Sequence, residues 1–346
     1  MNFTKLDQWN PPQDWLKVKT LDTHTAGEPL RIITSGFPEI PGDSILTQRK
    51  NITRNLDHIR KILINEPRGH ADMYGCILLP PVSPQADLGV IFFHNQGYST
   101  MCGHAIIALT KVVLETGLFP AISPQTRIRF ETPAGIVDAF AKIANNKIST
   151  IYFHNVPSFV LLRKKQIKLP ELGEVEFDIA FGGAFYALVD SRKLDISCRL
   201  ENVRKLISIG MLIKKRIMSE FPIKHPTEPE LGFLYGVIFT DEPQNKANHS
   251  RNVCIFADGQ VDRSPTGTGV SARLAMHYDR GEVKIGQRVK IESILGTIFT
   301  GSVIKTVDLN GIRAVIPRVE GNASITGSHE FYLDPEDPLG SGFIIR

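Results

Sequence analysis

Two stretches of this sequence match each other, and this match constrains the fold more than any other feature. The segment FFHNQGYSTMCGHAIIALTKVVLETG ends at Gly117, and it aligns with IFADGQVDRSPTGTGVSARLAMHYDRG, which ends at Gly281, so the offset is 164 residues. The identical positions are Phe92 with Phe256, Gln96 with Gln260, Gly103 with Gly267, Ala108 with Ala272, and Gly117 with Gly281. Such self-similarity at a fixed offset indicates a repeated structural unit.

A second pair of segments follows in the same order. RIRFETPAGIV, from Arg127, matches RVKIESILGTI, from Arg288. Each copy therefore predicts an apolar strand, a glycine-rich turn, a helix and a β-hairpin. The helices are expected at about 104–116 and 270–280; the first is apolar nearly all round, which indicates a helix enclosed by other structure. Gly117 and Gly281 suit the C′ position that ends a helix.

Elsewhere short β-rich runs dominate the sequence. They lie at 31–34, 76–79, 90–93, 151–153, 232–240 and 312–316. Many short strands with one buried helix per repeat predict an α+β fold, in which a β-rich sheet or barrel surrounds a central helix in each of two domains. A chain of 346 residues is long enough for two such domains. We expect the first at 1–150 plus 330–346 and the second at 151–329, with the active site in the cleft between them.

Composition narrows the class of protein. The N-terminus is polar and broken by prolines, unlike a signal peptide, and no run reaches the ~18 apolar residues that span a membrane. The net charge of +4 is mild, and the basic clusters at 163–165 and 214–216 have no interleaved aromatic residues, so we expect no nucleic-acid or membrane partner. The four cysteines form no C-x-x-C pair, which favours free thiols in a reducing cytoplasm.

The residue that opens each repeated helix differs between the copies. Cys102 stands in MCGH where Thr266 stands in SPTGTG. A helix N-terminus presents unpaired N–H groups that bind anions such as a carboxylate, and it lowers the pKa of a cysteine placed there. Two such helix ends facing each other would hold a carboxylate, with the α-proton of an amino acid between Cys102 and Thr266.

Structural interpretations compete with these chemical ones. A lone cysteine beside an apolar helix is usually a buried small hydrophobe, and we keep that interpretation for Cys76, Cys198 and Cys254. SPTGTG lacks the G-K-[ST] ending of a phosphate loop, and the histidines have no metal-ligand spacing, so we expect no metal and no cofactor. The Gly182-Gly183 pair is expected to allow a close backbone approach rather than to bind a cofactor.

At these residues the sequence resembles the proline racemase family, whose fold is that of diaminopimelate epimerase. The matching stretches are DTHTAGEPLR from Asp22, PRGHADM from Pro67, MCGH from Met101, FGGAFYALVD from Phe181 and DRSPTGTG from Asp262. They span almost the whole chain. The resemblance implies two catalytic positions on opposite faces of the substrate α-carbon, both of them cysteine in the racemases. Here the first is Cys102, and the second is Thr266 instead of cysteine.

This replacement changes the expected reaction. A threonine hydroxyl titrates far too high to act as a base near pH 7. We therefore expect one-sided removal of the α-proton by Cys102 and loss of water from trans-3-hydroxy-L-proline, giving Δ1-pyrroline-2-carboxylate. Two alternatives stay open: a hydroxyproline epimerase or proline racemase in which another group protonates the second face, and a non-catalytic protein that binds a proline-type ligand.

The resemblance also assigns residues to roles. Cys102 and Thr266 are expected to be catalytic. One hypothesis for Thr266 is that it forms a hydrogen bond with the leaving hydroxyl. The substrate-binding residues are expected to be Gly103, His104, Asp262, Gly267 and Thr268. Asp262 would receive the ring ammonium, although it could instead be a turn or capping residue. The family further implies that the protein forms a homodimer. We expect it to bind its small-molecule substrate and no other partner.

Overall fold

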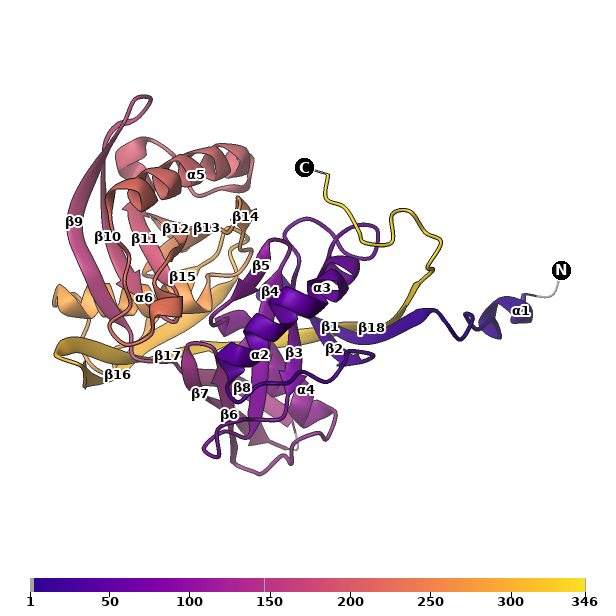
Figure 1. The fold of residues 1–346 in the computed structure, drawn as a ribbon. Coiled ribbons are helices and arrows are strands. Elements are labelled where there is room, and N and C mark those ends of the chain that lie inside the picture. The colour runs from indigo at the N-terminus through magenta and orange to yellow at the C-terminus, as the bar shows by residue number, and fades with distance from the viewer. Residues whose placement is uncertain (1–2, 146, 346) are drawn as a thin grey trace.

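The computed structural model describes residues 3–145 and 147–345. Figure 1 shows two halves lying side by side, with the earlier part of the chain (indigo to magenta) in one and the later part (magenta to orange) in the other. The first half holds β1 Leu16–Thr25, β2 Glu28–Ser35, β3 Tyr74–Leu79, β4 Leu88–His94, β5 Gly97–Ser99, β6 Gln125–Thr132, β7 Gly135–Ala144, β8 Lys147–His154 and, from the C-terminal part, β18 Ala323–Leu333. Its helices are α1 Thr4–Asp7, α2 Ile45–Asn51, the π-helical turn Ile52–Leu56, α3 Asp57–Ile64 and α4 Gly103–Glu115.

The second half is built from strands in the same succession. These are β9 Phe159–Leu169, β10 Gly173–Phe181, β11 Phe185–Asp190, β12 Leu234–Asp241, β13 Ser250–Phe256, β14 Gln260–Val261, β15 Val289–Glu292, β16 Ile298–Leu309 and β17 Ile312–Gly321. Its helices are α5 Val203–Glu220 and α6 Gly267–Asp279, with 3-10 turns at Ser191–Leu194, Leu200–Asn202 and Pro229–Leu231.

The strand pairing repeats between the halves. β2 and β3 run parallel, β3 and β4 antiparallel, and β4 pairs in parallel with β6 across α4. The second half has the same three pairings, in which β11 is parallel to β12, β12 is antiparallel to β13, and β13 is parallel to β15 across α6. The α+β fold of two repeated units that the sequence predicted is therefore confirmed.

Both repeated helices end in the same way, as the duplication predicts. Gly117 and Gly281 have φ angles of 75° and 74°, the left-handed conformation that glycine adopts at least cost. At the end of α6, the Gly281 and Glu282 N–H groups donate to the Tyr278 and His277 carbonyls, which is a Schellman motif. The side chains of α4 are buried almost all round, because α4 packs against β1, β7, β8 and β18, while α6 packs against β9, β10, β16 and β17.

Two helical layers were not predicted from the sequence. α2 and α3 connect β2 to β3, and α5 connects β11 to β12, so each layer is the crossover that a parallel strand pair requires. Leu206, Ile209, Ile213 and Ile217 of α5 are buried at intervals of three and four residues. This helical period was visible in the sequence. α5 packs on β12 and β13, and α3 on β4, so both layers cover their sheets from outside.

Two segments carry the chain between the halves, and they lie against each other. The end of β8 pairs with the end of β17, from Ile151↔Gly321 to His154↔Arg318, and Ser158 bridges to Val315. Figure 1 shows β17 running between the halves and β18 lying along β1. Because β18 pairs with β1 along its length, the strand pattern favours a domain boundary nearer 322 than 329. The division into two domains stays our proposal.

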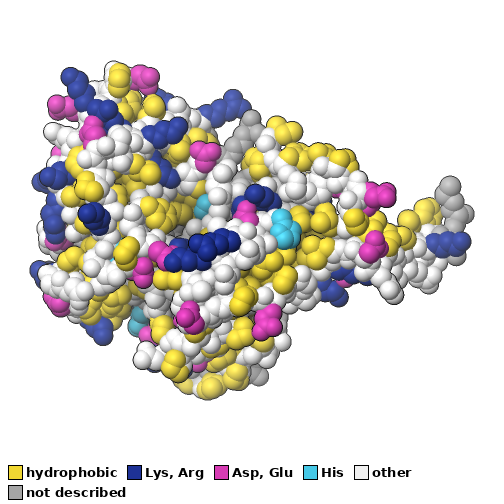
Figure 2. Space-filling model, in the orientation of Figure 1, with side chains coloured by type: hydrophobic (Ala, Val, Ile, Leu, Met, Phe, Trp, Pro, Cys, Tyr) yellow, Lys and Arg dark blue, Asp and Glu magenta, His cyan; other side chains and the backbone are white. Residues whose placement is uncertain are grey.

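The larger cluster of buried apolar side chains is continuous across both halves, and a smaller one lies between the sheet of the first half and α2 and α3. Within the described residues, no helix is long and apolar enough to cross a membrane. On the face shown in Figure 2, basic side chains lie dispersed among neutral and acidic ones.

Candidate active site

One small cavity brings together all the residues that the sequence singled out for chemistry. It lies where α4 of the first half meets α6 of the second. Its lining includes Cys102, Gly103, His104, Asp262, Thr266, Gly267 and Thr268. Its free volume is only about 20 Å³, so the cavity is almost closed in this structure. Seven further residues line it that the sequence did not mark, namely Glu28, Tyr74, Met101, Tyr186, Tyr235, Cys254 and Phe256.

The N-termini of the two repeated helices touch at their glycines. A Cβ atom added to Gly103 would lie 2.7 Å from the Gly267 Cα atom, and one added to Gly267 would lie 2.8 Å from the Gly103 Cα atom. Real Cβ atoms do not approach backbone so closely, so both positions require glycine at this separation. The first N–H groups of each helix have no intrahelical acceptor. Both helix ends line the cavity, which makes its floor a site for an anion.

Cys102 is the N-cap of α4, and its thiol is held by two neighbours. Sγ accepts a hydrogen bond from the Ala105 N–H at 3.4 Å, and the His104 Nδ1 atom lies 3.1 Å from Sγ. Burial lowers the pKa of His104 to about 3, so the ring is neutral at neutral pH. A ring nitrogen of His104 donates to the Pro29 carbonyl, which leaves the other nitrogen as a hydrogen-bond acceptor.

The pKa of Cys102 differs from the expectation. Burial raises it well above the ordinary thiol value, and the nearby Asp262 and Glu28 carboxyls raise it further. The Ala105 N–H at the helix end lowers the pKa, as expected, but does not offset these effects. The sequence identified the helix end and Asp262, but it did not show that Asp262 and Glu28 are both buried within electrostatic range of the thiol. A cationic ligand beside these carboxyls would cancel their effect and favour the thiolate.

Thr266 stands at the start of α6 with a strained backbone. Its φ of 66° and ψ of 95° are a genuine outlier for a β-branched residue, of a kind that costs about 1–3 kcal/mol and is found mainly at functional sites. Within the described residues, its buried Oγ1 atom forms no hydrogen bond of good geometry. The hydroxyl nevertheless lies close enough to Asp262 and Cys254 to lower the pKa of each.

Asp262 and Glu28 place two buried carboxyls in the cavity. Oδ1 of Asp262 accepts from the Ser264 N–H at 2.8 Å, and burial raises the pKa of this carboxyl. Glu28 begins β2, and its Oε2 atom accepts from the Arg263 N–H at 2.7 Å. Burial and the neighbouring Asp262 raise the pKa of Glu28 well above its ordinary value. Glu28 belongs to the GEP of DTHTAGEPLR, so the sequence held a signal for it that was not used.

Three tyrosine hydroxyls form part of the wall. Tyr74 bonds to Ser99 and lies 3.4 Å from the Tyr235 hydroxyl, and Tyr186 lies 2.6 Å from Thr268 Oγ1. Burial raises the pKa of all three, so they remain protonated donors. They come from strands in which an aromatic residue is ordinary core material, and of the three Tyr186 alone lies in a quoted matching stretch, FGGAFYALVD.

The Gly182-Gly183 pair serves the close approach that the sequence predicted. A Cβ atom on Gly182 would lie 2.2 Å from the Thr268 carbonyl oxygen, so only glycine lets this loop pass the first turn of α6. The Gly183 carbonyl accepts from Thr100 Oγ1 at 2.6 Å, and the Gly182 carbonyl from Asn155 Nδ2 at 2.7 Å. The loop thus ties both helix ends into one framework.

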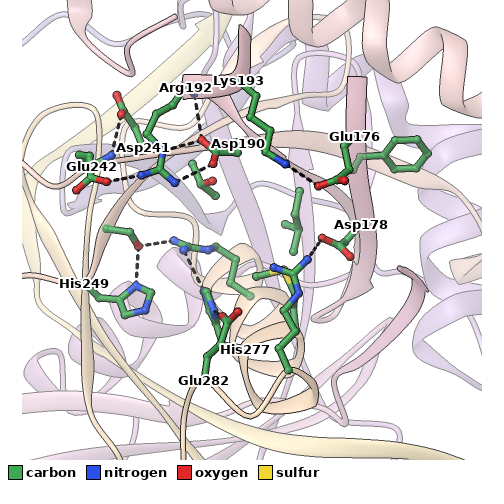
Figure 3. Close-up of a pocket in the computed structure, with 17 residues that line it drawn as sticks. Glu176, Asp178, Asp190, Arg192, Lys193, Asp241, Glu242, His249, His277 and Glu282 are labelled. Carbon is green, nitrogen blue, oxygen red and sulfur yellow. Dashed lines mark hydrogen bonds and ion pairs between the residues drawn. The ribbon is translucent and has the colours of Figure 1, made fainter. Parts of the chain in front are cut away.

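A larger pocket, with a free volume of about 310 Å³, lies away from this cavity, at the other end of α6 (Figure 3). None of the predicted site residues line it. Most of its charges are paired, since Arg192 binds Asp190, Lys193 binds Glu176, and Arg280 binds Asp178. Arg273 bonds to neutral groups there, among them Ser250 Oγ at 2.7 Å. These are structural pairings, and the cavity at the helix N-termini remains the candidate active site.

Comparison with known proteins shows which proteins the whole chain resembles. The family profile described as proline racemase matches residues 20–344. A trans-3-hydroxy-L-proline dehydratase of Colwellia psychrerythraea is 46% identical over 345 residues, which cover 99% of this chain and 97% of that protein. A 3-hydroxyproline 2-epimerase of Burkholderia multivorans is 43% identical over 329 residues, covering 95% and 98%. The crystal structure of a hydroxyproline epimerase from Agrobacterium vitis, with bound trans-4-hydroxy-L-proline, has a TM-score of 0.90 at 35% identity and covers 96% of each chain.

Proposed function

The chain belongs to the proline racemase family, and we propose that it is a trans-3-hydroxy-L-proline dehydratase, a hydro-lyase that works without a cofactor. One observation supports this most directly. The two helix ends in the cavity carry one cysteine between them, Cys102 of α4, and the matching position of α6 is Thr266, which cannot supply or take a proton near pH 7. Relatives that carry the dehydratase name agree with this proposal.

The cavity suggests how the substrate lies. The carboxylate binds at the touching helix ends, to N–H groups around Gly103 and His104 on one side and Gly267 and Thr268 on the other. The ring ammonium faces Asp262. C2 then lies between Cys102 and Thr266, and the ammonium cancels the carboxylate field that otherwise raises the pKa of Cys102.

The reaction follows with a closed proton balance. The Cys102 thiolate takes the α-proton, so the C2–H bond breaks and an S–H bond forms. The electron pair left on C2 becomes the C2=C3 double bond as the C3–O bond breaks, and the leaving hydroxide takes a proton to form water. The enamine product tautomerises to Δ1-pyrroline-2-carboxylate.

The stereochemistry of the substrate identifies the source of the last proton. In trans-3-hydroxy-L-proline the hydroxyl and the carboxylate lie on opposite ring faces, so the α-hydrogen and the hydroxyl share a face. Cys102, which takes the α-hydrogen, therefore also faces the leaving hydroxyl. The Cys102 thiol returns its proton to that hydroxyl and becomes a thiolate again, while neutral His104 is not an effective acid. This arrangement favours Thr266 as a group that closes the opposite face rather than one that binds the leaving hydroxyl.

Substrate analogues test the function. Purified protein with trans-3-hydroxy-L-proline should release the cyclic imine, which o-aminobenzaldehyde traps as a coloured adduct. With cis-3-hydroxy-L-proline, whose hydroxyl lies on the Thr266 face, the rate should be at least about 100-fold lower. Interconversion of enantiomers without loss of water would contradict the dehydratase proposal. Equal rates on the cis and trans substrates would contradict the shared-face mechanism alone.

Thr266→Cys should add an activity. A thiol on the second face can return a proton to C2, so this variant should convert L-proline to D-proline at least about 100-fold faster than the unmodified protein. Cysteine is not β-branched, so it also suits the positive φ at this position better than threonine does. Chiral chromatography of proline measures the effect. Thr266→Ser is the matched control. If Thr266→Ser racemised proline as fast as Thr266→Cys, the role proposed for the second thiol would be wrong.

The pH dependence should follow the raised pKa of Cys102. The active form is the thiolate, so a raised pKa means that kcat/KM keeps increasing as pH rises past the ordinary thiol pKa of about 9. In the substrate complex the ammonium offsets the two carboxyls, so the inflection in kcat should come at lower pH. Rate profiles from about pH 6 to about pH 10 measure both values. A kcat/KM that is flat above neutrality would show that Cys102 is ionised in the free protein.

A 3-hydroxyproline 2-epimerase is the second candidate, because a relative of that name is 43% identical over 95% of this chain. It requires a proton donor on the second face. Cys254 lies near Thr266, and burial raises its pKa, which keeps the thiol protonated, so it is the candidate for that donor. The chiral assay of the unmodified protein separates the two activities.

We also propose that the enzyme works as a homodimer in the cytoplasm. The four cysteines are buried free thiols, which suits a reducing compartment. The homodimer rests on the family resemblance. Size-exclusion chromatography with light scattering tests it.

A further inference from the structure

Glu28 is a buried carboxyl in the cavity wall to which the reaction above gives no role. Its side chain is fully buried, and Oε2 is fixed by the Arg263 N–H at 2.7 Å. Within the described residues, Oε1 accepts no hydrogen bond. A buried acceptor without a donor destabilises the protein, so such an atom in a ligand cavity indicates a missing donor.

Asp262 repeats this arrangement on the neighbouring part of the wall. Its Oδ1 atom is fixed by the Ser264 N–H at 2.8 Å, so each carboxyl is anchored through one oxygen by a backbone N–H of the same short segment. Residues 262–264 thus hold both acids in place. Glu28 and Asp262 both raise the pKa of Cys102, which places both carboxyls within electrostatic range of the thiol.

We infer that Glu28 and Asp262 together receive the ring ammonium of the substrate. A secondary ammonium has two N–H donors, and the cavity presents two carboxyls, each with one oxygen engaged by the backbone. Oε1 of Glu28 takes one N–H, and Asp262 takes the other. Glu28 is then a residue that determines specificity for a cyclic secondary amine. The inference rests on the proposed function for the substrate class, and it adds a second acceptor to the amine site.

The charges around Glu28 agree with a cationic ligand. Two carboxyls lie close to it, Asp262 and Asp72, and both raise its pKa. Against them stands Arg263, whose Nη1 atom is 3.7 Å from Oε2 of Glu28 and donates to the Asp72 carbonyl at 2.7 Å. The cavity therefore has more acid than base, and a ligand cation restores the balance.

Glu28→Gln tests this. The carbonyl oxygen of the new amide would accept from the Arg263 N–H, which turns the amide NH2 toward the ammonium. The variant should raise KM for trans-3-hydroxy-L-proline about 10- to 100-fold, the value of one charge-assisted hydrogen bond, with kcat changed less than about threefold. Calorimetry should show that the Kd for L-proline increases by the same factor. Pyrrole-2-carboxylate has one neutral N–H, so its Kd should change less than about threefold.

Two comparisons keep the test decisive. Glu131→Gln is the matched control, because Glu131 also accepts backbone N–H groups, those of Val82 and Ser83, and does not line the cavity. If Glu28→Gln weakened L-proline and pyrrole-2-carboxylate equally, Glu28 would be structural and the inference wrong. Should the variant not fold, N-methyl-L-proline replaces it: the unmodified protein should bind it at least about 10-fold more weakly than L-proline, and equal affinity would overturn the inference.

These outcomes are separable from those of the proposed function. A protein that binds L-proline with the expected dependence on Glu28 but never releases water would refute the dehydratase and keep the amine site. If the protein dehydrates the substrate and Glu28→Gln leaves KM unchanged, the dehydratase proposal stands and the role of Glu28 in the amine site is refuted.

Discussion

Cys102→Ser should lower kcat for dehydration about a thousandfold. The serine hydroxyl can accept the same Ala105 N–H and occupy the same N-cap position, so α4 should start unchanged. It cannot act as a base near neutral pH, because its pKa lies far above that of a thiol. Steady-state kinetics on trans-3-hydroxy-L-proline measure the loss, and KM should change little because the carboxylate and ammonium contacts remain.

Cys198→Ser is the matched control for this substitution. Cys198 is as buried as Cys102, but its thiol contacts Ser191 and the Phe239 carbonyl, outside the cavity. Its replacement should leave kcat within about twofold, since it touches no reacting atom. A Cys102→Ser protein that keeps more than about a tenth of the activity would show that another group removes the α-proton.

Gly267→Ala should lower kcat/KM about 100-fold or more. The added methyl would lie 2.8 Å from the Gly103 Cα atom, so backbone must move and the two helix ends must separate. Both Cys102 and Thr266 are fixed to these ends, and a displacement of about 1 Å at a reacting centre costs about 100-fold. The overpacking should also destabilise the protein by about 1–3 kcal/mol. Kinetics and thermal unfolding measure the two effects separately.

Gly281→Ala at the other end of α6 separates position from stability. Its φ of 74° makes alanine unfavourable there, but nothing lies within 4 Å of the added Cβ atom. Its unfolding temperature should fall while kcat/KM stays within about twofold. If Gly281→Ala lost as much activity as Gly267→Ala, the effect of Gly267→Ala would reflect stability rather than the contact between the helices.

The sequence predicted the parts of the fold that leave a periodic or repeated trace. Gly117 and Gly281 ended both helices as expected, and the strand, turn, helix and hairpin order of each copy is present. The crossover helices α2, α3 and α5 were missed although Leu206, Ile209 and Ile213 show a helical period. They lie outside the two aligned windows, so the duplication gave no reason to look for them. Which strands run parallel depends on contacts distant in sequence, and no local pattern reports them.

The candidate site shows the same division between local and distant information. Cys102 and Thr266 were found because the repeat places them at equivalent positions before glycines. Glu28 and the tyrosines reach the cavity from separate strands, and only the tertiary structure brings them there. The predicted lowering of the Cys102 pKa was wrong for the same reason. The helix end that lowers this pKa is a local feature, but the burial and the carboxyls that raise it depend on the tertiary structure. Roles of the site residues remain predictions until the variants are measured.

The paired segments that join the halves bear on how the substrate arrives. Every residue that lines the cavity is buried, and the free volume is only about 20 Å³, so we expect the halves to part when the ring enters and the product leaves. The two connecting segments lie side by side, from Ile151↔Gly321 to the Ser158↔Val315 bridge, and together they form a two-stranded ribbon that we expect to act as a hinge. Such a hinge bends more easily than it shears, because bending keeps the ladder hydrogen bonds between its strands. We expect opening to be a swing about this ribbon, and the frequency of such a swing would set an upper limit on turnover.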